Sequence, residues 1–187
     1  MSKFISKKAT VSKKSKLGKN VQVWDYVQIR EDVVIGDDCK IGKGTYIENH
    51  VRIGNSVKIQ NYASIYGEAE IGDEVFVGPY VCFTNDKIPR AANLKGELRS
   101  EAEWKKGKIT VKKGASIGAG SILITDIIIG EYALIGAGSV VTKSVASYNL
   151  VFGNPAKVKG FVCKCGNLVK RLNDPKKRTC TICKTKI

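Results

Sequence analysis

Histidine is almost missing from this sequence of 187 residues, in which His50 is the single example. One imidazole cannot form a three-histidine metal site, and no Ser-His-Asp set is available to build an acyl-enzyme. Long apolar runs are also missing, because Asp126 and Glu131 interrupt the most hydrophobic region. A membrane-spanning helix needs about 20 apolar residues, so we expect no membrane insertion. The first residues, MSKFISKK, lack the apolar core of a signal peptide, which favours a cytoplasmic location.

Acidic residues are scarce beside basic ones. Lys and Arg number 32 against 17 for Asp and Glu, which gives a net charge of +15. This excess favours anionic partners through long-range attraction. No arginine-rich helix or aromatic-basic motif accompanies the lysines, so we interpret the charge as serving nucleotide or coenzyme phosphates and consider nucleic acid the less favoured partner.

A six-residue hydrophobic period dominates the sequence, and a smaller residue follows each large one four positions later. The large series consists of Ile5, Val11, Leu17, Val23, Ile29, Ile35, Ile41, Ile47, Ile53, Ile59, Ile65, Ile71, Val77 and Phe83. A fixed period of six predicts a parallel β-helix, which makes the protein all-β. Three hexads close one triangular coil, so residues 18 apart should stack about 4.8 Å from one another.

The period is interrupted once. Its phase is lost after Phe83 and returns at Val111, so the polar stretch at about 86–108 should be ejected from the coil as a loop. Loops of this length inside a compact domain are usually functional or disordered. We favour a functional loop, because it holds Pro89, Arg90 and Trp104 between two regular blocks.

Four of the six cysteines crowd the end of the chain as Cys163, Cys165, Cys180 and Cys183. Paired cysteines at such spacing can place four thiolates around Zn²⁺. So short a segment has too small an apolar core to fold without a bound metal or a cross-link. We therefore divide the chain into a β-helix at 1–161 and a tail at 162–187 that resembles a zinc ribbon with structural zinc. Unmetallated thiols are the alternative. Cys39 should be a core residue, and Cys82 should face outward as a surface thiol or, alternatively, as a nucleophile.

The 18-residue stacking rule also places polar residues in columns. His50 shares a column with Asp32, Glu68 and Asp86, whose carboxylates would favour a charged imidazole and suit a structural ladder better than a catalytic base. Asn85 stands where the coil gives way to the loop, and small Gly67 lies below it. A concavity is expected there, although Asn85 could instead be a simple turn residue.

Several segments together resemble a known family. They read IQNYASIYG at 59–67, VFVGPYVCFTND at 75–86, GASIGAGSILI at 114–124, IGEYALIGAGSVVTKSV at 129–145 and GNPAKVKG at 153–160. The resemblance is to hexapeptide-repeat acyltransferases, which fold as left-handed β-helices, and among them to the N-acetyltransferases of nucleotide-linked amino sugars. The most similar subgroup acetylates the 3-amino group of UDP-2-acetamido-3-amino-2,3-dideoxyglucuronate. This chain departs from the subgroup in the order Gly67-Glu68 and in a longer loop.

The resemblance implies acetyl-CoA as cosubstrate, a site between the subunits of a homotrimer, and roles for individual residues. Asn85 would contact the sugar amine as the catalytic residue. The other acceptor-binding residues would be Asn61, Tyr66, Thr84 and Arg90. Coenzyme A would contact Gly136, Ala137 and Gly138 along its pantetheine arm, and Asn154, Pro155 and Lys157 in the exit segment at 147–161.

These observations favour direct transfer of acetyl from acetyl-CoA to the amine of a nucleotide-linked sugar, with a UDP-3-amino sugar as acceptor. Two alternatives stay open. One is a non-catalytic solenoid whose zinc ribbon and basic surface bind nucleic acid or protein. The other is an O-acetyltransferase acting on a sugar hydroxyl, for which His50 would be the expected base.

Overall fold

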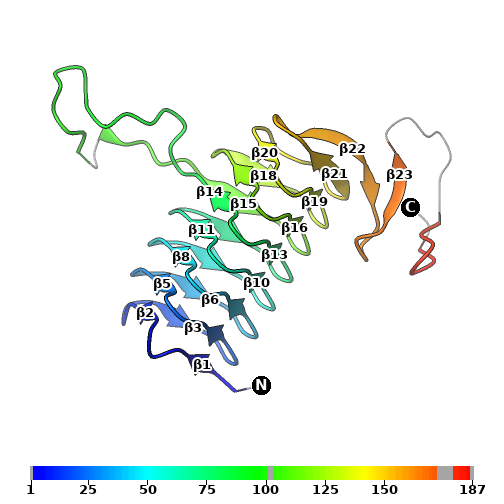
Figure 1. Ribbon diagram of the computed structural model, residues 1–187, viewed down its shortest axis with the longest axis horizontal. Helices are drawn as coiled ribbons and strands as arrows, with labels where there is room; N and C mark the ends of the chain where they lie inside the picture. The colour runs from blue at the N-terminus through cyan, green and yellow to red at the C-terminus, as the bar shows by residue number, and fades with distance from the viewer. Residues whose placement is uncertain (1, 101–102, 172–178, 186–187) are drawn as a thin grey trace.

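The computed structural model describes residues 2–100, 103–171 and 179–185. Regular structure in these ranges consists of very short β-strands that stack into a parallel solenoid, with a long loop leaving its side (Figure 1). Among the described residues, no helix has the length and apolar character that crossing a membrane requires. The all-β solenoid and the ejected loop predicted from the six-residue period are therefore confirmed.

Three sheets, here named A, B and C, form the sides of the solenoid, and the chain visits them in turn. Sheet A contains β1 (Phe4–Ile5), β4 (Gln22–Val23), β7 (Lys40–Ile41), β10 (Lys58–Ile59), β13 (Phe76–Val77), β16 (Ser116–Ile117), β19 (Leu134–Ile135), β21 (Asn149–Phe152), β22 (Lys157–Val162) and β23 (Leu168–Arg171). Sheet B contains β2 (Thr10–Val11), β5 (Gln28–Ile29), β8 (Tyr46–Ile47), β11 (Ser64–Ile65), β14 (Cys82–Phe83), β17 (Ile122–Leu123) and β20 (Val140–Val141). Sheet C contains β3 (Lys16–Leu17), β6 (Val34–Ile35), β9 (Arg52–Ile53), β12 (Glu70–Ile71), β15 (Ile109–Val111) and β18 (Ile127–Ile129).

The register follows the predicted 18-residue spacing. Ile47 pairs with Ile65, and Ile65 pairs with Phe83. Across the loop the spacing grows to 40 residues, because Ile71 pairs with Val111. The loop therefore adds one long excursion without disturbing the stack.

The large inward series forms one continuous core. Ile41, Ile65 and Phe83 are completely buried, as are Val57, Ala63 and Val81 in the small series. The first coil differs, because Ile5 is 41 % exposed. No coil covers it from below, so the large series is exposed to solvent at this open end.

The column predicted to contain His50 is wrong in its last member. Asp32, His50 and Glu68 occupy equivalent corners with φ near +60°. Asp86 does not continue the column, since the pairing of Glu70 with Thr110 puts residue 108 above residue 68. Asp86 instead enters the loop, where its carboxylate accepts a hydrogen bond from the Ile88 N–H.

The chain leaves the solenoid by changing direction. Strands β21, β22 and β23 pair antiparallel at the end of sheet A. Beyond them a second apolar cluster contains Cys163, Val169 and Cys180, with Phe161 packed against it. In Figure 1 this C-terminal unit and the loop project from different sides of the stack. The predicted division at 161 thus falls within β22, close to where the second cluster begins.

Candidate functional site

Asn85 lies two residues after the end of β14, at the corner where sheet B turns into sheet C; we call this corner column the B/C edge. The residue is only 7 % exposed. Its amide Nδ2 donates a hydrogen bond to Glu48 Oε2 at 3.1 Å, and its backbone carbonyl accepts one from the Gly107 N–H at 2.8 Å. The second bond closes the base of the ejected loop, so Asn85 is fixed at both its side chain and its backbone.

Glu48 reaches Asn85 across an intervening coil. The two residues are 37 apart in sequence, so one full coil separates them. Gly67 occupies that coil, and its N–H also donates to Glu48 Oε2 at 2.6 Å. A Cβ at position 67 would lie 3.2 Å from this oxygen, which is a tight contact. The missing side chain of Gly67 therefore opens the path by which the carboxylate meets the amide.

The carboxylate also settles which way the amide faces. A carboxylate can only accept hydrogen bonds, so Nδ2 of Asn85 must turn toward Glu48. The carbonyl oxygen Oδ1 then faces away from Glu48 and remains an acceptor. Such an oxygen can accept a hydrogen bond from an N–H group of a ligand.

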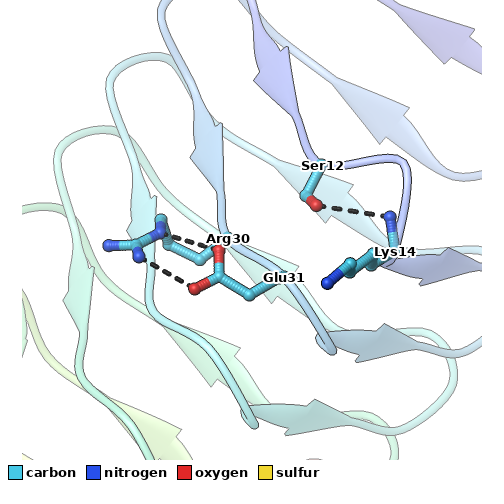
Figure 2. A network of polar contacts seen from close by, with 4 residues as sticks. All are labelled: Ser12, Lys14, Arg30 and Glu31. Atoms are coloured by element: carbon cyan, nitrogen blue, oxygen red, sulfur yellow. Dashed lines mark hydrogen bonds and ion pairs between the residues drawn. The ribbon is translucent and has the colours of Figure 1, made fainter.

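The basic residue below Glu48 is engaged elsewhere. Arg30 directs its guanidinium to its neighbour Glu31, with Nη2–Oε1 at 2.8 Å and Nε–Oε2 at 3.0 Å (Figure 2). These bonds lower the pKa of Glu31. Both side chains are partly exposed, so the pair adds little stability. Arg30 therefore already has a carboxylate partner in Glu31.

Tyr66 and Thr84 follow Glu48 on the B/C edge. Burial raises the pKa of Tyr66, whose ring packs 5.7 Å from Tyr46. The Thr84 hydroxyl donates to the Leu123 carbonyl and accepts from the Thr125 N–H, both at 3.1 Å, so its contacts lie within the stack. Nearby Cys82 is half-buried, and this burial raises the pKa of its thiol. A raised pKa disfavours the thiolate, which weighs against a nucleophilic Cys82.

The residues expected to hold coenzyme A lie at another corner, between sheets A and B; we call it the A/B edge. Gly136, Ala137 and Gly138 connect β19 to β20. The turn after β21 packs beside them, because Val140 donates to the Gly153 carbonyl and accepts from the Ala156 N–H. Exposed side chains at this turn and just after it belong to Asn154, Pro155 and Lys157.

This part of the A/B edge is bare. Gly120 and Gly138 stack in one column with φ of +67° and +68°, and a Cβ on either would meet no atom within 4 Å. In the two coils that precede Gly120, the same column carries Tyr62 and Tyr80, whose rings stack 5.3 Å apart. The A/B edge thus changes from an aromatic ridge to an open strip of backbone.

A single chain does not bring all the expected site residues together. Asn85, Tyr66 and Thr84 are on the B/C edge, and exposed Arg90 is on the loop that leaves it. Asn61 is on the A/B edge, where its Oδ1 accepts from the Lys43 N–H at 3.0 Å. The coenzyme residues share that edge. Exposed His50 is one corner position beyond Asn49 on the B/C edge.

The four terminal cysteines converge. Their sulfur atoms all lie within 4.8 Å of one another, and Cys163 and Cys183 approach to 3.2 Å. Four Zn–S bonds of about 2.3 Å in a tetrahedron space the sulfurs roughly 3.8 Å apart, so the cluster has the size of a zinc site. The Cys183 N–H donates to Cys180 Sγ and lowers the pKa of that thiol to about 6, whereas the pKa values of Cys163 and Cys165 are raised. The thiolate that metals bind is therefore favoured at Cys180.

Sequence reasoning missed Glu48. The stacking rule alone places Glu48 below Tyr66 and Thr84, so the signal was present in the spacing. Its contact with Asn85 was not, because 37 is not a multiple of 18. The contact requires the further inference that a glycine in the middle coil leaves a gap.

Known proteins resemble this chain in part. It is 53 % identical over 68 residues to dTDP-3-amino-3,6-dideoxy-α-D-galactopyranose 3-N-acetyltransferase of Aneurinibacillus thermoaerophilus, covering 36 % of this chain and 35 % of that one. It is 34 % identical over 87 residues to galactoside O-acetyltransferase of Lactococcus lactis, covering 46 % and 42 %. The matches therefore span less than half the length of these curated relatives.

Solved structures share the architecture. A candidate acetyltransferase of Bacillus cereus superposes with a TM-score of 0.55 at 27 % identity, over 83 % of this chain and 79 % of that one. A Caulobacter crescentus protein solved with CoA and GDP-perosamine gives a TM-score of 0.54 at 24 % identity, over 86 % and 58 %, a likeness that concerns the fold alone.

The repeats themselves match a family model. The bacterial transferase hexapeptide (six repeats) model covers residues 14–49, 50–85 and 108–143, which is more than half of the chain. The gap between the last two spans coincides with the ejected loop. This chain therefore belongs to the hexapeptide-repeat family of bacterial transferases.

Proposed function

We propose that this protein transfers the acetyl group of acetyl-CoA directly to the amine of a nucleotide-linked amino sugar, with a UDP-3-amino sugar as the favoured acceptor. The observation that carries the proposal is the buried Asn85 amide, oriented by Glu48 at the base of the loop. The local identity of 53 % to a 3-N-acetyltransferase acting on a dTDP-linked sugar supports a 3-amino acceptor. That relative uses another nucleotide, so the nucleotide belongs to the test.

In this proposal Asn85 positions the reacting nitrogen. Its Oδ1 accepts one N–H of the sugar amine and directs the nitrogen lone pair toward the thioester carbonyl. The nitrogen forms the new N–C bond, the C–S bond breaks, and the proton lost by nitrogen ends on the released CoA thiol. A sugar amine is partly unprotonated near neutral pH, so alignment of the two reactants can supply much of the rate. Backbone N–H groups at the coil corners would stabilise the tetrahedral oxyanion.

The proposal requires two copies of the chain. Asn85 is on the B/C edge, whereas the bare strip for pantetheine and the turn at 153–156 are on the A/B edge. One site forms when the B/C edge of one copy faces the A/B edge of its neighbour. Three copies close such a head-to-tail arrangement into a ring, so we propose a homotrimer. Tyr66, Thr84 and Arg90 would then contact the sugar from one copy and Asn61 from the next.

We also propose that the four terminal cysteines hold a structural zinc ion. All four positions of a tetrahedron would be filled by sulfur, which leaves no open position for a substrate. The apolar cluster around the cysteines is small, and metal ligation would supply the stability that it lacks. A reducing compartment such as the cytoplasm would keep these thiols available.

The test of the proposed reaction is an assay of coenzyme A release with acetyl-CoA and a panel of UDP- and dTDP-linked 3-amino sugars. We expect Asn85→Ala to lower kcat/KM at least a hundredfold, and His50→Ala to change it less than threefold. The reverse pattern would assign the base role to His50 and favour O-acetylation. Absence of acetyl-CoA binding in calorimetry would favour a non-catalytic scaffold.

A further inference from the structure

A cavity of about 500 Å³ opens at the base of the ejected loop. Its lining includes Gly107, which donates the backbone bond that closes the loop onto Asn85, and Asp86, which follows Asn85 in the chain. The cavity is therefore adjacent to the position proposed for the acceptor nitrogen. It is formed by one chain, from the loop and from the corner of the next coil, which contributes Thr125 and Asp126.

Two buried polar atoms in this lining have no hydrogen-bond partner among the described residues. They are the indole Nε1 of Trp104 and the hydroxyl Oγ1 of Thr125. Thr125 as a whole is 2 % exposed. A buried donor without an acceptor is costly, and native proteins leave few of them. Both can donate a hydrogen bond, so both lack the same kind of partner, an acceptor oxygen.

The charges around the cavity favour an anion. Five cationic side chains line it against two carboxylates. Lys87 is paired with Asp126 at 3.9 Å. The guanidiniums of Arg90 and Arg99 each donate to a backbone carbonyl, of Pro89 and Glu103 respectively, and within the described ranges neither forms an ion pair with a carboxylate in this lining. Arginine forks bind carboxylates and phosphates with paired hydrogen bonds.

We infer that this cavity binds a negatively charged group of the acceptor, a carboxylate or a phosphate, through Arg90, Arg99 and the two unpartnered donors. The inference rests on the proposed function, because it takes the acceptor nitrogen to lie at Asn85. Binding draws the Trp104 N–H and the Thr125 hydroxyl onto the anion's oxygens by a small shift of the loop side of the cavity. Coenzyme A is not the occupant, since only its uncharged thioester end reaches Asn85.

Two groups of a nucleotide sugar are anions that fit this cavity, and substrates with and without a sugar carboxylate distinguish them. A sugar carboxylate would make the cavity a selector for uronates. The diphosphate would make it a general nucleotide-sugar site. The same side chains would bind the sugar carboxylate in the first case and the diphosphate in the second. One set of variants therefore distinguishes the two cases.

The variants remove one donor each while keeping shape. Thr125→Val replaces the hydroxyl by a methyl group, and Trp104→Phe removes the indole N–H but keeps an aromatic ring. Thr10→Val, on the exposed first coil, is the matched control. The free Thr125→Val protein should be as stable as the wild type or more so in thermal unfolding, because an unpartnered hydroxyl is lost. A purely structural role for Thr125 predicts the opposite.

Binding is measured first by calorimetry with UDP-glucuronate, UDP-glucose and UDP, none of which carries the reactive amine. We expect Thr125→Val and Trp104→Phe each to weaken binding about tenfold. A loss confined to UDP-glucuronate identifies the carboxylate, and an equal loss for all three identifies the diphosphate. Unchanged affinities in both variants, or no binding by the wild type, overturn the inference.

Turnover separates this inference from the proposed function. If the wild type acetylates an amino sugar and the variants keep its KM, the cavity is not the anion site and the proposed reaction stands. If the variants weaken UDP-sugar binding but no amine is acetylated, the cavity binds the anion and the proposed reaction fails.

Discussion

Two halves of the A/B edge share a backbone and differ in what they carry. In the N-terminal half the corner column holds Tyr62 and Tyr80, both with φ of +59°, and the Tyr62 ring fills the space beside Gly44. In the C-terminal half the same column holds Gly120 and Gly138, with φ near +67° and open space beside them. The fold tolerates a tyrosine at this conformation, so the glycines are not required by the backbone. What these glycines provide is a strip of backbone that no side chain covers.

The B/C edge uses a missing side chain in a different way. Gly67 interrupts a column in which Asn49 and Asn85 are its neighbours, and the gap is filled by the Glu48 carboxylate from another position. One glycine therefore joins two protein groups, whereas the A/B glycines leave room for a ligand. Both effects follow from removing a side chain within an otherwise regular stack.

Among changes that test this comparison of the two edges, the largest effect is expected from breaking the contact that Gly67 permits. Glu48→Ala leaves Asn85 free to rotate, so its Oδ1 no longer faces the amine in every molecule. We expect kcat to fall roughly thirtyfold with KM for acetyl-CoA nearly unchanged, because loss of a charge-assisted hydrogen bond affects alignment rather than coenzyme binding. Steady-state kinetics with both substrates measures the two effects separately.

Glu48→Gln is the matched control for that change. Its amide oxygen can still accept from Asn85 and Gly67, so kcat should stay within about threefold of the wild type. An equal loss in both variants would mean that the negative charge matters and the orientation of Asn85 does not. A loss in neither would remove Glu48 from the mechanism.

The second-largest effect is expected from making the two halves of the A/B edge alike. Gly138→Tyr places a tyrosine in the bare strip, two coils beyond Tyr80 in the same column, where the ring would occupy the proposed path of pantetheine. We expect KM for acetyl-CoA to rise at least tenfold, with little change in the melting temperature, because Tyr62 and Tyr80 show that this φ accepts the side chain.

The reverse substitution, of a tyrosine by glycine, tests the role of the stacked tyrosines. Tyr80→Gly removes a ring stacked on Tyr62, which costs about 1 kcal/mol of stability, and should leave KM for acetyl-CoA unchanged. If Gly138→Tyr binds acetyl-CoA as tightly as the wild type does, coenzyme A does not lie along this strip.

The solenoid was predictable because its signal is repeated. Each coil independently places a large apolar residue at the same phase, so the inward series from Val23 to Phe83 follows from counting. The exceptions arise where the repetition stops. Ile5 is exposed because no coil lies below it, and Asp86 leaves its column because the loop begins there.

The candidate site was predictable only in part. Asn85 was found from its place at the end of the first block, but its partner was hidden, because Glu48 reaches it diagonally through the gap at Gly67. Trp104 was noted in the sequence only as one residue of a functional loop, and Thr125 gave no sequence signal. They meet only because the loop folds back onto the next coil, a path that the hexapeptide period does not specify.

The smallest effect on activity is expected at the C-terminal unit, whose apolar cluster is separate from the solenoid core. Cys180→Ser should abolish stoichiometric zinc, measured by metal analysis of protein purified under reducing conditions, whereas the control Cys82→Ser should retain it. Strand β22 is paired with β21 as well as with β23, so the turn at 153–156 should keep its place and kcat/KM should stay within twofold. Hydrogen exchange should accelerate in β23 and the cysteine segments but not in the coils, since loss of zinc removes the staple of the second cluster alone. A zinc-free wild type would leave the cysteines as ordinary thiols, and faster exchange throughout the coils would show that the metal supports the whole solenoid.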